Sequence, residues 1–297
     1  MPASHLTSLS RTTVQPLLRL ALKEDGASRD ITSRAVLSPK ARIRAQLIAK
    51  ATGVLAGGQV AAWTFQTLDP SVQCILKRRD GDRLAKGQTV LTVEGRARSI
   101  FAAERTALNL VGHLSGIATL TRTFMNRAGN RRVAILDTRK TLPGLRILEK
   151  HAVRAGGGQS HRAGLDDAIL IKTNHLRVLR GDAEWTQEAD RFIAETVRQA
   201  KRVRPKRFTE VEVSTLTEFK AALRAQPDAI LLDNWAVGEI RKAVRLRNQA
   251  GRRPLLEVSG GVTLSNVRAI ARTGVERISI GRLTHSAPSL DLALRVE

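Results

Sequence analysis

The second half of this 297-residue chain alternates short apolar runs with amphipathic stretches of helical spacing. Such alternation is typical of successive strand–helix units, which build a parallel sheet. Six runs have the length and composition of buried strands: 133–136, 168–171, 211–213, 229–232, 255–258 and 278–280. Because a closed barrel of this type has eight strands, the sequence predicts an α/β fold with an incomplete (β/α) barrel.

The first half has a different pattern. It begins with a helical stretch near residues 14–23, and residues 43–47 alternate as in a sheet exposed to water on one face. A long helical stretch over 103–126 leads into the first barrel strand. We therefore predict an amino-terminal open α/β sandwich domain over residues 1–116, to which residues 286–297 return. Residues 117–285 would form the barrel with the active site.

The charge balance is strongly basic, with 50 Lys and Arg against 27 Asp and Glu and a net charge of +23. This charge attracts phosphates, nucleic acids or anionic metabolites. Proteins that bind nucleic acid concentrate basic residues and interleave aromatic ones. Here aromatic residues are only 3% and the basic residues are spread along the chain, so we expect no specific nucleic-acid partner.

Several classes of protein are disfavoured by what the sequence contains. The single cysteine, Cys74, allows no intrachain disulfide and no thiolate metal site. No apolar stretch approaches the ~20 residues that span a bilayer, and the first residues lack the apolar segment of a secretory signal. We expect no membrane contact and a cytoplasmic location.

Polar residues follow the predicted strands. Five cations lie at strand ends or in the adjoining loops, within the segments LDTRKTLPGLR, GGGQSHRAG and AILIKTNH: Arg139, Lys140, His161, Arg162 and Lys172. Carboxyl ends of barrel strands converge on one mouth. Arginine holds a carboxylate through a planar fork, and lysine offers a point charge suited to phosphate. The segments therefore predict a site for a small ligand with several negative charges; the alternative is that these are ordinary surface cations.

A series of further motifs covers nearly the whole chain: LKEDGASRDIT (22–32), GVLAGG (53–58), AERTALNLVGHLSGIAT (103–119), GGGQSHRAGLDDAILIKTNH (156–175), EVEV (210–213), ILLDNW (230–235), EVSGGV (257–262) and SIGRLTHS (279–286). In these motifs and their order, the chain resembles the quinolinate phosphoribosyltransferase family, the decarboxylating nicotinate-nucleotide pyrophosphorylases. Two details depart from the family pattern. Gln159 and Ser160 precede the loop histidine, and Arg282 follows the glycine of the phosphate site.

The resemblance implies roles for particular residues. Arg139, His161, Arg162 and Lys172, with Arg105 of another subunit, would hold the carboxylates of quinolinate. Lys140, Glu212 and Asp233 are the candidate catalytic residues, and Glu212 and Asp233 would hold Mg²⁺ directly or through water. The remaining candidate substrate-binding residues are Thr138, Ser259, Gly260, Gly261, Gly281 and His285.

The resemblance also implies the reaction and the assembly. Quinolinate and phosphoribosyl pyrophosphate would give nicotinate mononucleotide, pyrophosphate and CO₂ in de novo NAD biosynthesis. Mg²⁺ is expected and no organic cofactor, because a pyridinium can accept the electrons released with CO₂. The expected assembly is a homodimer or hexamer whose subunits share the active site.

Some alternatives stay open from the sequence. Glu210 alternates with Glu212, so it would point either into the site or toward an internal arginine. His175 suits a ligand contact and a loop hydrogen bond equally. The related molybdenum-associated branch shares the fold, although Lys172 favours the quinolinate branch. A basic nucleic-acid-binding protein on an enzyme fold is the rival from another class, and its binding should weaken steeply with salt.

Overall fold

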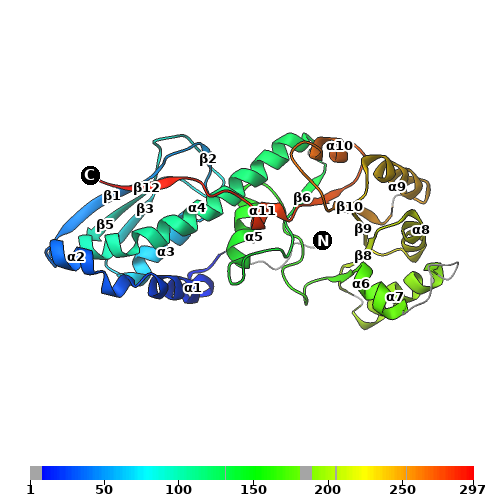
Figure 1. The fold of residues 1–297 in the computed structure, drawn as a ribbon, viewed down its shortest axis with the longest axis horizontal. Coiled ribbons are helices and arrows are strands. Elements are labelled where there is room, and N and C mark those ends of the chain that lie inside the picture. Colours follow the sequence, from blue (N-terminus) through cyan, green and yellow to red (C-terminus); the bar gives the residue numbers. More distant parts are fainter. Residues whose placement is uncertain (1–8, 131, 181–188, 205, 252) are drawn as a thin grey trace. The chain divides into compact units, whose positions relative to one another are not determined.

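The computed structural model describes residues 9–130, 132–180, 189–204, 206–251 and 253–297 (Figure 1). These residues form two compact units. The sandwich unit comprises residues 9–122, 140–158 and 282–297, and the barrel unit comprises the described parts of 123–139 and 159–281. No helix among the described residues is long and apolar enough to cross a membrane.

The sandwich unit is built on an antiparallel sheet of order β12-β1-β5-β3, with helices α3 and α4 alongside it (Figure 1). Its elements are α1 (Arg11–Glu24), η1 (Ala27–Arg29), α2 (Ile31–Val36), β1 (Arg42–Ala49), β2 (Gly53–Val54), α3 (Gly58–Leu68), β3 (Gln73–Leu76), β4 (Arg83–Leu84), β5 (Thr89–Arg96), α4 (Ala97–Ala128), α5 (Arg146–Ala155), α11 (Arg282–His285) and β12 (Leu292–Val296). The core includes fully buried Leu47, Phe65, Leu91 and Ile100. The expected sandwich is therefore present, with apolar residues on its inner face.

The carboxyl-terminal segment crosses α4 where that helix has glycine. The backbone N–H of Leu290 donates to the carbonyl of Gly112 at 2.9 Å. A Cβ placed on Gly116 would lie 2.1 Å from the carbonyl oxygen of Pro288, so a larger residue would clash there. Beyond this crossing, β12 pairs with β1 from Leu292 to Val296. Residues 292–296 thus complete the amino-terminal sheet.

The division into units differs from the boundary expected between residues 116 and 117. Helix α4 is continuous across that point, and residues 140–158 cluster with the sandwich unit. Two hydrogen bonds tie α5 to that unit: His151 to Asp80 at 2.6 Å and Glu149 to His113 at 2.8 Å. The division into domains over residues 1–116 and 117–285 stays a prediction.

The barrel unit contains a six-stranded parallel sheet of order β6-β11-β10-β9-β8-β7. Its elements are β6 (Ala134–Leu136), β7 (Ile169–Ile171), α6 (Thr173–Arg180), α7 (Ala189–Val203), β8 (Thr209–Val213), α8 (Leu216–Ala225), β9 (Ala229–Asp233), α9 (Val237–Gln249), β10 (Leu255–Ser259), α10 (Val267–Ala271) and β11 (Arg277–Ser279). No ladder among the described residues joins β6 to β7. The barrel is therefore incomplete, as the six apolar runs predicted.

Alternation along these strands separates two environments. One face carries Val211, Ile230, Leu256 and Ile278, all fully buried. The other face carries the charged residues Glu210, Glu257 and Arg277, which are also buried. The apolar face explains why the strands read as short hydrophobic runs, and the charged face lies inside the barrel unit.

Candidate active site

Strand register brings the predicted site residues to one edge of the sheet. Leu170 pairs with Glu210, Leu231 with Glu212, Asp233 with Ser259, and Ser279 with Leu136. Since alternate residues share a face, the residues that continue this face at the strand ends also lie together. They are Thr138, Lys172, Glu212, Asp233, Ser259 and Gly281. The carboxyl ends of the six strands thus form a polar site.

Lys172 and Glu212 form an ion pair at this edge, with Nζ 3.7 Å from Oε2. The other carboxylate oxygen of Glu212 accepts from the backbone N–H of Thr173 at 3.2 Å and from the Thr173 hydroxyl. His175 accepts from the backbone N–H of Lys172 through Nδ1 at 3.0 Å. This bond gives His175 a local structural role, and Thr173 is a contact that sequence reasoning missed.

Two glycines after β10 permit a close approach of backbones. Gly260 and Gly261 have φ of +82° and +60°, and a Cβ on Gly260 would lie 2.2 Å from Oδ1 of Asn234. Asn234 itself donates to Asp233 Oδ2 at 3.1 Å and, through its backbone N–H, to the carbonyl of Ser259 at 2.9 Å. Glycine is therefore required at 260 by space as well as by conformation. A backbone free of side chains suits the approach of a phosphate.

Arg139 and Arg162 are two cations held near one another. Arg139 follows β6, and Arg162 lies in the loop after Gln159, whose backbone bridges to Leu136. Arg162 is buried and donates to the carbonyl of Ala168 at 3.2 Å. Burial lowers the pKa of Arg162, and the charge of Arg139 lowers it further, against the opposite effects of Glu210 and Asp167.

The Nε atom of Arg139 is buried and has no hydrogen-bond partner among the described residues. Two like charges side by side, one with an unused buried donor, are unfavourable unless an anion binds them. This pair is thus a candidate anion-binding site. Gln159, which departs from the family pattern, contacts β6 through backbone hydrogen bonds: its N–H donates to the carbonyl of Ile135, and its carbonyl accepts from the N–H of Asp137. A change of side chain at this position therefore leaves these bonds intact.

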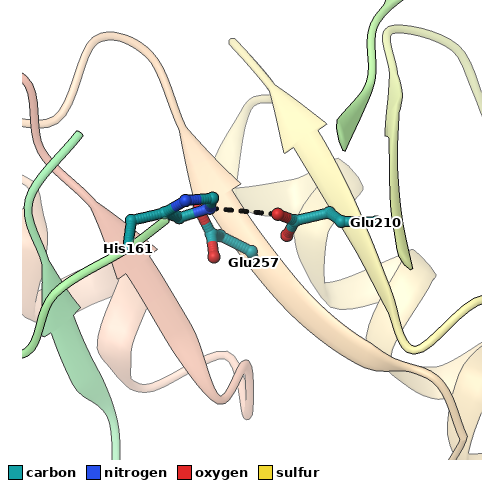
Figure 2. A group of neighbouring side chains, drawn as sticks. All are labelled: His161, Glu210 and Glu257. Atoms are coloured by element: carbon teal, nitrogen blue, oxygen red, sulfur yellow. Dashed lines mark hydrogen bonds and ion pairs between the residues drawn. The ribbon is translucent and has the colours of Figure 1, made fainter. Parts of the chain in front are cut away.

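His161, directly before Arg162 in the chain, lies beside two buried carboxylates (Figure 2). Its Nε2 is 3.0 Å from Glu210 Oε2 and 3.3 Å from Glu257 Oε1. Glu257 also accepts from Arg277 Nε at 2.6 Å, and the Arg277 guanidinium lies over the ring of Phe208. The sequence left Glu210 either pointing into the barrel or pairing with an internal arginine. The structure bonds it to His161, and the charge of Arg277 acts on it as well.

The charge state of His161 follows from a competition. The Arg162 backbone N–H donates to its Nδ1 at 2.8 Å, which suits a neutral ring. Burial favours the neutral ring too, yet Glu257 and Glu210 outweigh burial and raise the pKa of His161 to about 9. A lost hydrogen bond costs about 1–3 kcal/mol, whereas an uncompensated buried charge costs about 3–5 kcal/mol. The raised pKa favours the protonated ring at neutral pH.

Three predicted site residues belong to the sandwich unit. Arg105 is exposed on α4, and His285 is exposed at the end of α11, with Nδ1 2.6 Å from the Ser286 hydroxyl. Lys140 is exposed, and its carbonyl accepts from the Thr284 hydroxyl at 2.7 Å. All other predicted site residues belong to the barrel unit.

The fold and the site together define a class: an incomplete α/β-barrel enzyme with a cationic site for an anionic ligand at the carboxyl ends of its strands. Comparison with known proteins gives the particular family. Residues 117–295 match the family model of the quinolinate phosphoribosyl transferase C-terminal domain, and residues 30–115 match that of the N-terminal domain. The chain belongs to the quinolinate phosphoribosyltransferase family.

Individual relatives agree with this assignment. A Bacillus subtilis protein named probable nicotinate-nucleotide pyrophosphorylase (carboxylating) is 38% identical over 95% of this chain and 93% of its own. The Mycobacterium leprae nicotinate-nucleotide pyrophosphorylase (carboxylating) is 39% identical over 93% and 95%. The solved structure of the nicotinate-nucleotide pyrophosphorylase from Francisella tularensis superposes with a TM-score of 0.89 at 35% identity, covering 98% of this chain and 99% of that one.

Proposed function

We propose that this protein is a quinolinate phosphoribosyltransferase, which makes nicotinate mononucleotide, pyrophosphate and CO₂ from quinolinate and phosphoribosyl pyrophosphate in NAD biosynthesis. The observation that carries the proposal is the pair of arginines, Arg139 and Arg162. Their charges repel one another, and Nε of Arg139 is buried without a hydrogen-bond partner among the described residues, so a bound dianion would stabilise both. Quinolinate has two adjacent carboxylates. Two guanidinium groups match it better than they match a single phosphate, because each binds a carboxylate through a planar fork.

The phosphoribosyl group is assigned to the neighbouring strand ends. The backbone at Ser259, Gly260 and Gly261 suits the 5-phosphate, because no side chain at 260 or 261 blocks a close approach. Glu212 and Asp233, on the adjacent strands β8 and β9, suit the ribose. Their carboxylates would stabilise the positive charge that develops at ribose C1.

The residues present also fit a magnesium ion. Glu212 and Asp233 supply hard carboxylate oxygens, which Mg²⁺ prefers, and it keeps several waters when bound. Glu212 is engaged by Lys172 and Thr173 and Asp233 by Asn234, so we propose that both hold the ion, directly or through water. When bound, the ion would neutralise the oxygens of the departing pyrophosphate.

The bonds of the reaction balance without an organic cofactor. The pyridine nitrogen forms a bond to ribose C1 as the bond from C1 to pyrophosphate breaks. The resulting pyridinium accepts the electron pair of the carbon–carbon bond that breaks as CO₂ leaves, and a proton replaces the lost carboxyl group. Arg139 and Arg162 would hold the ring during both steps, and Lys140 is assigned a place between the dianion and the sugar phosphate.

The proposal is tested by mixing the purified protein with quinolinate, phosphoribosyl pyrophosphate and Mg²⁺. We expect nicotinate mononucleotide and CO₂ in equal amounts, detected by chromatography and by trapping of labelled CO₂. Absence of both products would refute the proposed function. The pyrophosphorylase names of the relatives favour this reaction over that of the molybdenum-associated branch.

The assembly and the location belong to the same proposal. We propose a homodimer or hexamer in which Arg105 of one subunit serves the site of another, and a cytoplasmic location. Light scattering of the purified protein tests the first statement, and fractionation of cells tests the second.

A further inference from the structure

Two buried carboxylates have no part in the reaction as proposed. Glu210 is 1% exposed and Glu257 is 0% exposed, and both carboxylates lie beside Nε2 of His161 (Figure 2). Glu210 Oε1 is buried without a hydrogen-bond partner among the described residues, and Glu257 Oε1 is 3.3 Å from His161 Nε2. Burying two such groups is costly, and replacing buried ionic groups by apolar ones is often neutral or stabilising. Fold stability alone is therefore a poor explanation for the pair.

The contacts of His161 indicate what the pair does. Its Nε2 is held by Glu210 and Glu257, and its backbone N–H donates to Asp137 Oδ1 at 2.9 Å. Asp137 lies two residues before Arg139, and Arg162 follows His161 directly. One residue, His161, thus ties the barrel interior to the segments that carry both arginines, through its side chain on one side and its backbone N–H on the other.

We propose that Glu210 and Glu257 are positioning residues for the dicarboxylate substrate, acting through His161 to hold Arg139 and Arg162 at the spacing that the two carboxylates require. This inference rests on the proposed function and assigns roles to two residues that would not touch the substrate. Binding sites require such support, because loosely held charges lose affinity.

A metal ion is a weaker explanation for this cluster. The ligand atoms of His161, Glu210 and Glu257 lie within 4.8 Å of one another, as in a metal site. However, the Arg277 guanidinium already binds Glu257 at 2.6 Å. A divalent cation would add charge beside this buried cation, and the carboxylates are already balanced by Arg277 and protonated His161.

The test uses the near-isosteric variants Glu210→Gln and Glu257→Gln of the full chain. Displaced arginines should raise KM for quinolinate on the order of 10- to 100-fold, since a small displacement of a binding group weakens its contact with the substrate strongly. KM for phosphoribosyl pyrophosphate should change less than about threefold, because Glu212 and Ser259, two residues further along the same strands, are held by contacts that do not involve His161. Ser279→Ala, which removes a hydrogen bond to Glu257 and no charge, should raise KM for quinolinate to a smaller extent.

Two controls separate positioning from general destabilisation. Val244→Ala shortens a buried side chain of α9 and should lower stability while leaving both KM values unchanged. In a His161→Gln background, Glu210→Gln should have little further effect on KM for quinolinate, because the two act through one side chain.

The outcomes are distinct. An unchanged KM for quinolinate in the folded variants would overturn the inference. So would equal rises in both KM values, or additive effects of Glu210→Gln and His161→Gln. Failure of the proposed function shows separately, as absence of product from the unaltered protein. In that event, calorimetric binding of quinolinate still compares the variants, and equal affinity would sink the positioning role.

Discussion

Arg277 donates a hydrogen bond from Nε to Oε2 of Glu257 at 2.6 Å, in surroundings where the two residues are only 6% and 0% exposed. Removing one partner of a buried pair leaves the other charge uncompensated. We expect Arg277→Met to lower the free energy of unfolding by about 3–5 kcal/mol, measured by urea denaturation. The double variant Arg277→Met, Glu257→Gln should lose less than the two single losses combined. A loss below about 1 kcal/mol in Arg277→Met would contradict the pairing.

Stability should depend on pH in a window set by His161. Its folded pKa of about 9 lies above the ordinary value of 6.5, so its contribution is complete below pH 6.5 and disappears as the pH rises to 9. We expect unfolding free energy to fall across this window by up to the order of 3 kcal/mol. Urea denaturation at a series of pH values measures it, and Glu257→Gln should show a smaller fall. A flat profile would mean that the Arg162 amide keeps Nδ1 unprotonated.

Glu257 gives the opposite dependence at acid pH. Its pKa is lowered from 4.5 to about 2 because the charges of His161 and Arg277 outweigh burial. The contribution of Glu257 to stability is therefore present above pH 4.5 and is lost as the pH falls toward 2. Denaturation between pH 5 and pH 3 should show weaker acid sensitivity in Glu257→Gln than in the unaltered protein.

Arg139→Ala should weaken quinolinate binding. The lost contact is charge-assisted and worth about 1.5–3 kcal/mol, which corresponds to a rise in KM of roughly 10- to 150-fold. Steady-state kinetics with varied quinolinate measure the change. The matched control is Arg272→Ala, because Arg272 is exposed on the surface of the same unit. Unchanged kinetics in Arg139→Ala would remove the basis of the proposed function.

Gly260→Ala should impair phosphoribosyl pyrophosphate binding more than Gly261→Ala. Both positions have positive φ, which costs a non-glycine residue about 1–2 kcal/mol. Only at 260 does an added Cβ clash, 2.2 Å from Asn234 Oδ1, against 3.9 Å at 261. KM for phosphoribosyl pyrophosphate and the unfolding free energy should both shift further in Gly260→Ala. Equal effects of the two variants would contradict the packing described.

Gly116→Ala should destabilise the sandwich unit by about 1–3 kcal/mol, because the added methyl group meets the Pro288 carbonyl at 2.1 Å. Gly238→Ala in α9 is the matched control. No atom lies within 4 Å of its added Cβ, so it should stabilise the protein by about 0.4–1 kcal/mol. Thermal unfolding of both variants shows the direction, and a neutral Gly116→Ala would argue against the crossing at α4.

Much of the barrel could be predicted from the sequence. The six apolar runs correspond to β6 through β11, because strands packed under helices must be hydrophobic on that face. The predicted helix over 103–126 lies within α4, and that over 14–23 within α1. Apolar residues at helical spacing also predict a helix over 185–197. Residues 185–188 lie outside the described residues, and α7 begins at Ala189.

The sequence also identified Arg139, Arg162 and Lys172 as candidate site residues, since polar residues at strand ends and in the adjoining loops converge on the mouth of a barrel. Their role in binding stays a prediction. The family followed from motif order, which needs no coordinates. These features are local, and each depends on a few neighbouring residues.

Only the tertiary structure decided the partners of the buried charges. In the sequence, Glu257 is one polar residue in an apolar strand and Arg277 is one of many cations. The parallel pairing of β10 with β11 places the two side by side. The alternation of Glu210 and Glu212 predicted that both point inward. Their different partners, His161 and Lys172, depend on strand order and register. Pairing energies inside a barrel arise from residues far apart in the chain, so the sequence determined which groups are charged and the fold determined which charges meet.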